Sequence, residues 1–224
     1  MYGTPNIVSD VMTQTVAAVG RRAPFKEIVQ LMQDWQVSAL PVIEGEGRVV
    51  GVVSEADLLV KEELRDDPDA ADLPLRRPSD VAKAEALTAG DLMSSPAVTV
   101  QAGATVAEAA RIMARAGVKR LPVVDEIDML QGIVSRADLL KVFLRDDADI
   151  AAEVRHEIVA HLFPPASSSV QVEVHDGVVT LGGLIRDSAL VPVAARLVRA
   201  VKGVVDVRFG LARDDHEVSG AGRP

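Results

Sequence analysis

The sequence predicts a mixed α/β protein with two copies of a β-α-β-β-α unit, followed by a smaller α-β-β-α-β unit. Three observations predict this class. Short stretches recur at an offset of 81 residues, apolar runs of strand length alternate with amphipathic helical runs, and the pattern changes near residue 146. A chain of 224 residues has room for two or three small domains of this kind.

The repeat is visible in three stretches that return 81 residues later: 10–12 as 91–93, 37–42 as 118–123, and 51–59 as 132–140. About a third of the positions in 10–59 are identical to their partners, and no gap is needed. Chance would give only a few identities. The pattern therefore indicates a duplicated structural unit.

Each copy is predicted to run strand, helix, strand, strand, helix. In the second copy Thr105 and Glu108 have the spacing of a capping box, and Gly117 suits the end of the helix that follows. The other elements expected in that copy are strands at 97–100, 121–124 and 132–134 and a helix at 137–144. The first copy is expected to have the equivalent helices at 25–35 and 56–64.

The third unit begins after residue 146. Its expected elements are a helix at 149–162, strands at 170–174 and 178–182 joined by a turn at 175–177, a helix at 188–201 and a strand at 203–211. The acidic stretch 66–80 contains three prolines, which favours a surface connection. The predicted divisions are 7–64, a linker at 65–90, 91–145, 147–212, and a disordered tail at 213–224.

Composition excludes several classes of protein. There is no cysteine, so disulfide frameworks, thiolate metal sites and thiol catalysis are excluded. A net charge of −9 and an aromatic content of 3% argue against nucleic-acid binding, which needs basic and stacking surfaces. The start of the sequence does not resemble a secretory signal, and no apolar run is long enough to span a membrane. We therefore expect a cytoplasmic protein.

The sequence contains none of the common catalytic motifs. The four histidines lack the spacing of a zinc-protease helix, and no phosphate-binding Walker loop, Rossmann glycine pattern or nucleophile elbow is present. No catalytic residue and no metal ligand is predicted. The sequence therefore favours a protein that is not an enzyme.

Two parts of the sequence resemble known protein families. The repeat is similar to a tandem pair of CBS domains (a Bateman module) over about residues 7–145. The most specific motif is Gly51, Ser54 and Asp57, which returns as Gly132, Ser135 and Asp138, with a Leu-Pro-Val stretch before each. The C-terminal unit looks like a BON domain. The stretches that carry this second resemblance are 170–174, 176–182 and 201–207.

The CBS resemblance implies that the two copies pack as a pseudo-twofold pair. It also implies an adenosyl ligand in clefts between the copies, namely AMP, ATP or S-adenosylmethionine, as a regulatory ligand rather than an obligatory cofactor. In the family, the Asp accepts hydrogen bonds from the ribose hydroxyls and the Ser contacts the ribose or phosphate. These roles carry over to Asp57 with Ser54, and to Asp138 with Ser135. A carboxylate in the first turn of a helix is also favoured by the helix dipole. The same spacing is that of a plain helix cap, and both roles can hold at once.

The two copies differ in charge around this motif. The second copy carries Lys119, Arg120 and Arg136, where the first has Ser38, Ala39 and Glu55. Cations favour a phosphate, so we expect an anionic nucleotide to prefer the cleft that contains Asp138. Two alternatives remain open. The cations can be solvated surface charges, or a cation from one copy can reach the ligand of the other.

The leading interpretation is a non-catalytic regulatory sensor. It binds an adenine nucleotide or a related adenosyl ligand, forms a homodimer through the CBS pair, and has the BON domain as an interaction or attachment module. A protein partner is expected, but its identity is open. One alternative is a structural or assembly protein with vestigial ligand sites. Another is an adaptor that binds membrane lipids through the BON domain, although residues 146–224 carry a net charge of −4, which disfavours anionic lipid surfaces.

Overall fold

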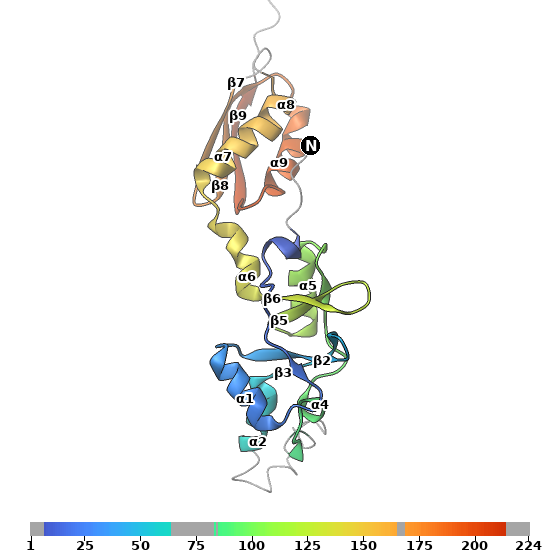
Figure 1. Ribbon diagram of the computed structural model, residues 1–224. Coiled ribbons are helices and arrows are strands. Elements are labelled where there is room, and N and C mark those ends of the chain that lie inside the picture. The colour runs from blue at the N-terminus through green and yellow to red at the C-terminus, as the bar shows by residue number, and fades with distance from the viewer. Residues whose placement is uncertain (1–6, 64–82, 84, 165–168, 214–224) are drawn as a thin grey trace, which may run out of the picture. The chain divides into compact units, whose positions relative to one another are not determined.

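The computed structural model describes residues 7–63, 83, 85–164 and 169–213 (Figure 1). The described chain divides into two compact units, one spanning Ile7–Leu139 and the other beginning at Leu140. Most of the predicted linker at 65–90 lies outside the described residues, namely 65–82 and 84. The predicted disordered tail also lies outside them, apart from residue 213.

The first unit contains both repeat copies, and each follows the predicted order of elements. The first copy consists of β1 (Val19–Gly20), α1 (Phe25–Asp34), β2 (Ala39–Glu44), β3 (Arg48–Ser54) and α2 (Glu55–Glu63). The second consists of β4 (Val100–Gln101), α5 (Val106–Ala116), β5 (Arg120–Val124), β6 (Leu130–Ser135) and α6 (Arg136–Leu140). The mixed α/β fold is confirmed. The strand expected at 97–100 is wrong in its limits, because pairing with β5 begins only at Val100.

Each copy has its own three-stranded sheet, in which the middle strand pairs in parallel with the first and antiparallel with the third. The second and third strands pair in the same register in both copies. Leu40 lies opposite Val53, and Leu121 lies opposite Val134. The pairing shifts at the same place in both, directly after Val42 and directly after Val123. One pattern of inward-facing apolar residues therefore specifies both sheets.

The predicted capping box at the start of α5 is confirmed. The Glu108 carboxylate accepts a hydrogen bond from the Thr105 backbone amide at 2.8 Å, and the Thr105 hydroxyl accepts one from the Glu108 amide at 3.2 Å. These bonds to the charged carboxylate, first among them the backbone bond from Thr105, lower the pKa of Glu108. The helix ends at Gly117, which adopts φ +70°, a left-handed conformation that glycine adopts without strain.

The two copies complete each other's cores. The 3₁₀ turn η1 (Val8–Asp10) precedes the first copy, yet Val8 is fully buried in the core of the second. The helix α4 (Ala89–Leu92) precedes the second copy, yet Ala89 and Leu92 are fully buried in the core of the first. The two copies therefore form one folded body rather than two independent domains.

Backbone hydrogen bonds fix both crossing segments to the third strand of the copy they enter. Thr13 and Ile133 exchange two bonds of 2.9 Å, and Ser94 and Val52 exchange bonds of 2.9 and 3.1 Å. The motif glycines lie beside these contacts. A Cβ at Gly132 would lie 2.9 Å from the Thr13 carbonyl oxygen, and one at Gly51 would lie 3.0 Å from the Ser94 carbonyl oxygen. Glycine is needed at both places because a backbone passes too close for a side chain.

The second unit has the predicted α-β-β-α-β order. A continuous helical stretch is formed by α7 (Asp147–Glu153), the wider π-helical turn η4 (Val154–Val159) and α8 (Ala160–Leu162). It is followed by β7 (Ser169–His175), β8 (Val178–Ile185), the short turn η5 (Ser188–Leu190), α9 (Val191–Arg199) and β9 (Asp206–Arg213). β8 is the central strand, antiparallel to β7 and parallel to β9. Both helical segments pack into one apolar core with the sheet.

The predicted turn between β7 and β8 is a tight hairpin. Its two central residues, Asp176 and Gly177, have φ values of +49° and +72°. Positive φ at both positions is characteristic of the type I′ turn, whose twist matches that of the flanking antiparallel strands. In the pairing of β7 with β8, His175 lies opposite Val178. With this register, Val172 and Val179 lie in the core.

Gly132 lies against the backbone of the crossing segment, so the addition of one methyl group at this position should destabilise the protein. We expect Gly132→Ala to lower the free energy of unfolding by about 1–3 kcal/mol, since the Thr13 backbone must move to admit the Cβ. Gly103→Ala is the matched control, because a Cβ there meets no atom within 4 Å. Urea unfolding of both variants measures the difference. Equal stability of the two variants would contradict the assigned contact.

Candidate functional site

A cavity of about 320 Å³ lies between the two repeat copies in the first unit. The first copy contributes the start of β2, Val52 and the β3–α2 junction. The second copy contributes residues 94 and 96–98, which precede β4, and residues 117–120, which lead into β5. Apolar side chains, including Val52, Val98 and Val118, share the walls with several polar and charged groups. Such a mixed cavity suits a ligand that has both an apolar ring and polar substituents.

The β3–α2 junction places Asp57 in this cavity. Ser54 ends β3, and both its amide and its hydroxyl donate to Asp57 Oδ2, at 2.8 and 2.7 Å. The carboxylate therefore caps α2, as the spacing predicted. The same bonds hold the side chain in one orientation, with Oδ1 still available to other donors. The cap and a ligand role are compatible in this geometry.

Lys119 and Arg120 line the same cavity as Asp57. Arg120 also borders a second, adjoining cavity of about 390 Å³, which it shares with Ser38 and Glu55. Its Nη1 atom is buried and has no hydrogen-bond partner among the described residues. A buried guanidinium donor without a partner is energetically costly.

Lys83 is the nearest charged partner of Asp57. Its ammonium group pairs with Asp57 Oδ1 and lies 3.4 Å from the Ser94 hydroxyl oxygen. The side chains of Lys83 and Asp57 are only 14% and 12% exposed. An ion pair shielded to this degree is weakly screened by salt and holds both groups in place.

The second copy repeats the Ser–Asp geometry. The Ser135 amide and hydroxyl donate to Asp138 Oδ2 at 2.9 and 2.6 Å. Arg136 donates from Nη2 to the Val118 carbonyl oxygen at 3.0 Å and is exposed. None of Ser135, Arg136 and Asp138 lines the cavity that contains Asp57.

The sequence groups Lys119 and Arg120 with Asp138, whereas the structure places both in the lining of the cavity that contains Asp57. Both cations lie in the cavity of Asp57, at the start of β5, opposite the β3–α2 junction of the other copy. One alternative left open by the sequence was that a cation of one copy lies near the Asp of the other copy. The lining of this cavity agrees with that alternative.

Sequence reasoning missed Lys83 and Ser94. Lys83 lies in the connection between the copies, where no repeat or periodicity marks a residue. Ser94 corresponds to Thr13 in the 81-residue repeat, which could have shown that this segment has a shared role in both copies.

Comparison with known families agrees with this architecture. The CBS domain family matches residues 8–62 and 89–145, and the BON domain family matches residues 146–211. The chain is a CBS-pair protein with a C-terminal BON domain. The two resemblances expected from the sequence are confirmed.

Three relatives of the CBS pair are informative. The crystal structure of CBSX2 from Arabidopsis thaliana in complex with AMP has 29% identity and a TM-score of 0.54, and the match covers 62% of this chain and 97% of that one. Uncharacterized protein MJ1426 of Methanocaldococcus jannaschii is 27% identical over 62% of this chain and 91% of its own length. The 5′-AMP-activated protein kinase subunit gamma-3 of Bos taurus is 32% identical over 61% of this chain.

The length covered differs greatly among the relatives. The match spans 26% of the kinase subunit, and between 35% and 52% of three other archaeal relatives. The chain therefore spans about a quarter to a half of the length of these four relatives. The matches to the two CBSX2 structures cover about three-fifths of the chain.

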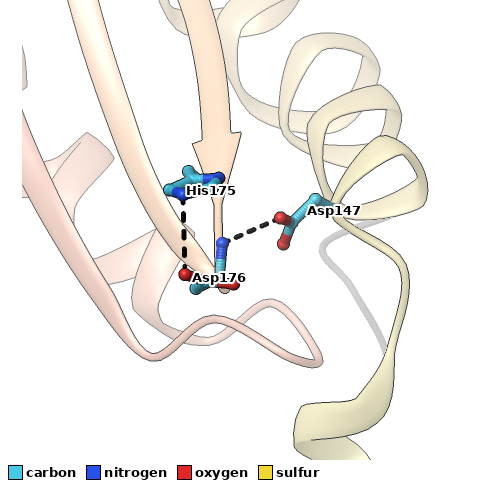
Figure 2. A group of neighbouring side chains, drawn as sticks. All are labelled: Asp147, His175 and Asp176. Carbon is cyan, nitrogen blue, oxygen red and sulfur yellow. Dashed lines mark hydrogen bonds and ion pairs between the residues drawn. The ribbon is translucent and has the colours of Figure 1, made fainter.

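The BON domain holds a small polar cluster at its hairpin (Figure 2). The Asp147 carboxylate, at the start of α7, accepts hydrogen bonds from the backbone amides of Asp176 and Gly177, both at 2.8 Å. His175 Nε2 lies 3.5 Å from Asp176 Oδ2, and both of these side chains are almost fully exposed. Potential metal-ligand atoms of the three residues lie within 4.8 Å of one another. The two hydrogen bonds from these backbone amides to the Asp147 carboxylate explain the arrangement, because they anchor the hairpin to the start of α7.

Within the described part of the chain, no helix is both long enough and apolar enough to cross a membrane.

The hairpin anchor predicts a local effect. In Asp147→Ala we expect amide hydrogen exchange at Asp176 and Gly177 to increase about tenfold or more, since both amides lose a charged acceptor. Asp147→Asn retains one carbonyl oxygen, so one of the two amides should stay protected. Exchange measured by NMR resolves the two amides, and unchanged rates in Asp147→Ala would rule out the anchor.

Proposed function

We propose that the CBS pair binds an adenine nucleotide in the cavity lined by Ser54, Asp57, Lys119 and Arg120, and that it acts as a regulatory sensor rather than an enzyme. The observation that carries the proposal is the meeting of one oriented carboxylate and two cations in a single cavity with apolar walls. The carboxylate suits a ribose diol, the cations suit a phosphate, and the apolar wall suits a purine. The AMP complex of CBSX2, a relative with a similar fold, supports this ligand class.

The charges in the cavity favour a nucleotide over S-adenosylmethionine. Two cationic residues, Lys119 and Arg120, line it. S-adenosylmethionine carries two positive charges, on its sulfonium and ammonium groups, and only one carboxylate, so its net positive charge is less favourable beside these cations than a phosphate is. The preferred ligand is therefore anionic, with AMP or ATP ahead of S-adenosylmethionine.

Binding can regulate only if it favours one arrangement of the CBS copies over another. The proposed ligand touches both copies, because Asp57 belongs to the first and Lys119 to the second. It thus stabilises the arrangement in which these groups face each other. The BON domain is the proposed module through which a protein partner detects the change.

Nucleotide binding is tested by calorimetry with AMP, ATP, adenosine and S-adenosylmethionine. We expect Asp57→Asn to weaken binding of every adenosine ligand by about 10- to 100-fold, the cost of losing a charge-assisted acceptor. Lys119→Gln should weaken AMP and ATP but leave adenosine unchanged. Lys26→Gln, at an exposed position on α1 outside the cavity, is the matched control.

Two outcomes would contradict the proposal. If the wild-type protein binds none of these compounds, the sites are vestigial and the assembly-protein alternative is favoured. If Asp138→Asn abolishes binding while Asp57→Asn does not, the ligand occupies the cleft of the other copy. Thermal unfolding of each variant without ligand verifies that it is folded.

The proposal includes a homodimer formed through the CBS pair. Leu59 on α2 and Leu140 on α6 occupy equivalent positions of the repeat and are 58% and 61% exposed. Large apolar side chains that recur, exposed, at the same place in both copies favour contact with a second apolar surface. A second copy of this chain offers the same surface, as a symmetric interface requires.

Substitution of these leucines tests the dimer. Leu59→Glu combined with Leu140→Glu should weaken self-association by about a hundredfold or more, because like charges would face each other across the interface. Ile127→Glu, a 64% exposed apolar residue in the β5–β6 turn, should leave it unchanged. Sedimentation velocity over a concentration series measures both. A monomeric wild-type protein would rule out this interface.

A further inference from the structure

We propose that Lys83 makes the cavity selective for phosphorylated adenosine ligands, by acting as a counter-ion that the ribose of the ligand displaces from Asp57. This inference rests on the proposed function and extends it to one residue outside the CBS motif. Lys83 lies in the connection between the copies, and its ammonium group pairs with Asp57 Oδ1.

The number of acceptor positions on Asp57 makes the exchange necessary. A carboxylate has about four lone-pair positions, two on each oxygen. Oδ2 already accepts from the Ser54 amide and hydroxyl, and Oδ1 accepts from Lys83. One position is left, whereas the two hydroxyls of a ribose diol need two. A diol that binds Asp57 through both hydroxyls must therefore displace Lys83.

Displacement has a different cost for different ligands. The Asp57–Lys83 pair is largely shielded from water, so separating it leaves an ammonium group without its counter-charge in a poorly solvated place. A neutral nucleoside brings only hydroxyl groups and offers no replacement. A nucleotide brings a phosphate, which the flexible lysine stem can reach after it leaves Oδ1. Phosphorylated ligands therefore recover the lost interaction, and unphosphorylated ones do not.

Ser94 supports this role by its position. Its hydroxyl oxygen lies 3.4 Å from the Lys83 ammonium nitrogen, and Ser94 itself lines the cavity. The lysine head thus lies beside two residues that line the cavity, Asp57 and Ser94. Its side chain is only 14% exposed, so its release from Asp57 carries a desolvation cost.

The test compares AMP with adenosine in calorimetry of the full chain. In Lys83→Met we expect adenosine to bind several-fold more tightly and AMP to bind equally or less tightly. The ratio of AMP to adenosine affinity should then fall about tenfold, the loss of one charge-assisted interaction. Lys83→Gln keeps an N–H donor for Oδ1 and serves as a second test if the Met variant does not fold. It should also lower the ratio of AMP to adenosine affinity. Lys83→Arg keeps the charge and should preserve the ratio, and Lys26→Met is the control for the loss of a lysine elsewhere.

The outcomes separate this inference from the proposed function. If the wild-type protein binds AMP in an Asp57-dependent way and the ratio is unchanged in Lys83→Met and Lys83→Gln, the role of Lys83 is wrong and the proposed function stands. If both ligands gain affinity equally, Lys83 merely competes with ribose and confers no selectivity, which also overturns the inference. If the wild-type protein binds neither ligand, the proposed function fails and the inference fails with it.

Discussion

The paired hydrogen bonds between Thr13 and Ile133, and between Ser94 and Val52, hold the CBS pair together at two related places. They guide each entering segment across to the other copy, where Val8 and Leu92 become fully buried. Without that exchange, each copy would expose the part of its core that these side chains fill, at a cost of several kcal/mol per large residue. Folding of one copy is therefore linked to the presence of the other.

The same exchange creates the cavity. Residues 94 and 96–98 follow the crossing helix α4 and reach the first copy next to Asp57. The cavity is thereby built from both copies, and no single CBS domain contains it. A ligand in such a place stabilises the contact between copies, which is the physical requirement for a sensor. A cavity enclosed within one copy would stabilise that copy alone.

Much of this architecture is predictable from sequence because it depends on local patterns. The spacing of Thr105 and Glu108 predicted a helix start, and the repeated Ser–Asp spacing predicted both caps. The place of Lys119 in the cavity of Asp57 was not predictable, since membership of the second repeat does not show how the two copies face each other. Gly51 and Gly132 were used only as parts of a motif. Their physical reason, a crossing backbone about 3 Å from the Cβ position, appears only when both copies are in place.

The cap and the proposed ligand site share the Asp57 side chain, and this sharing has an energetic consequence. Ser54 holds Oδ2 with two hydrogen bonds, so the carboxylate does not have to be ordered when a ligand arrives. A freely rotating carboxylate would lose that entropy on binding. The cap thus prepares the acceptor, and Lys83 occupies the oxygen that the cap leaves available. The helix start therefore fixes the orientation of Asp57, while the proposed exchange at Oδ1 decides which ligands can use it.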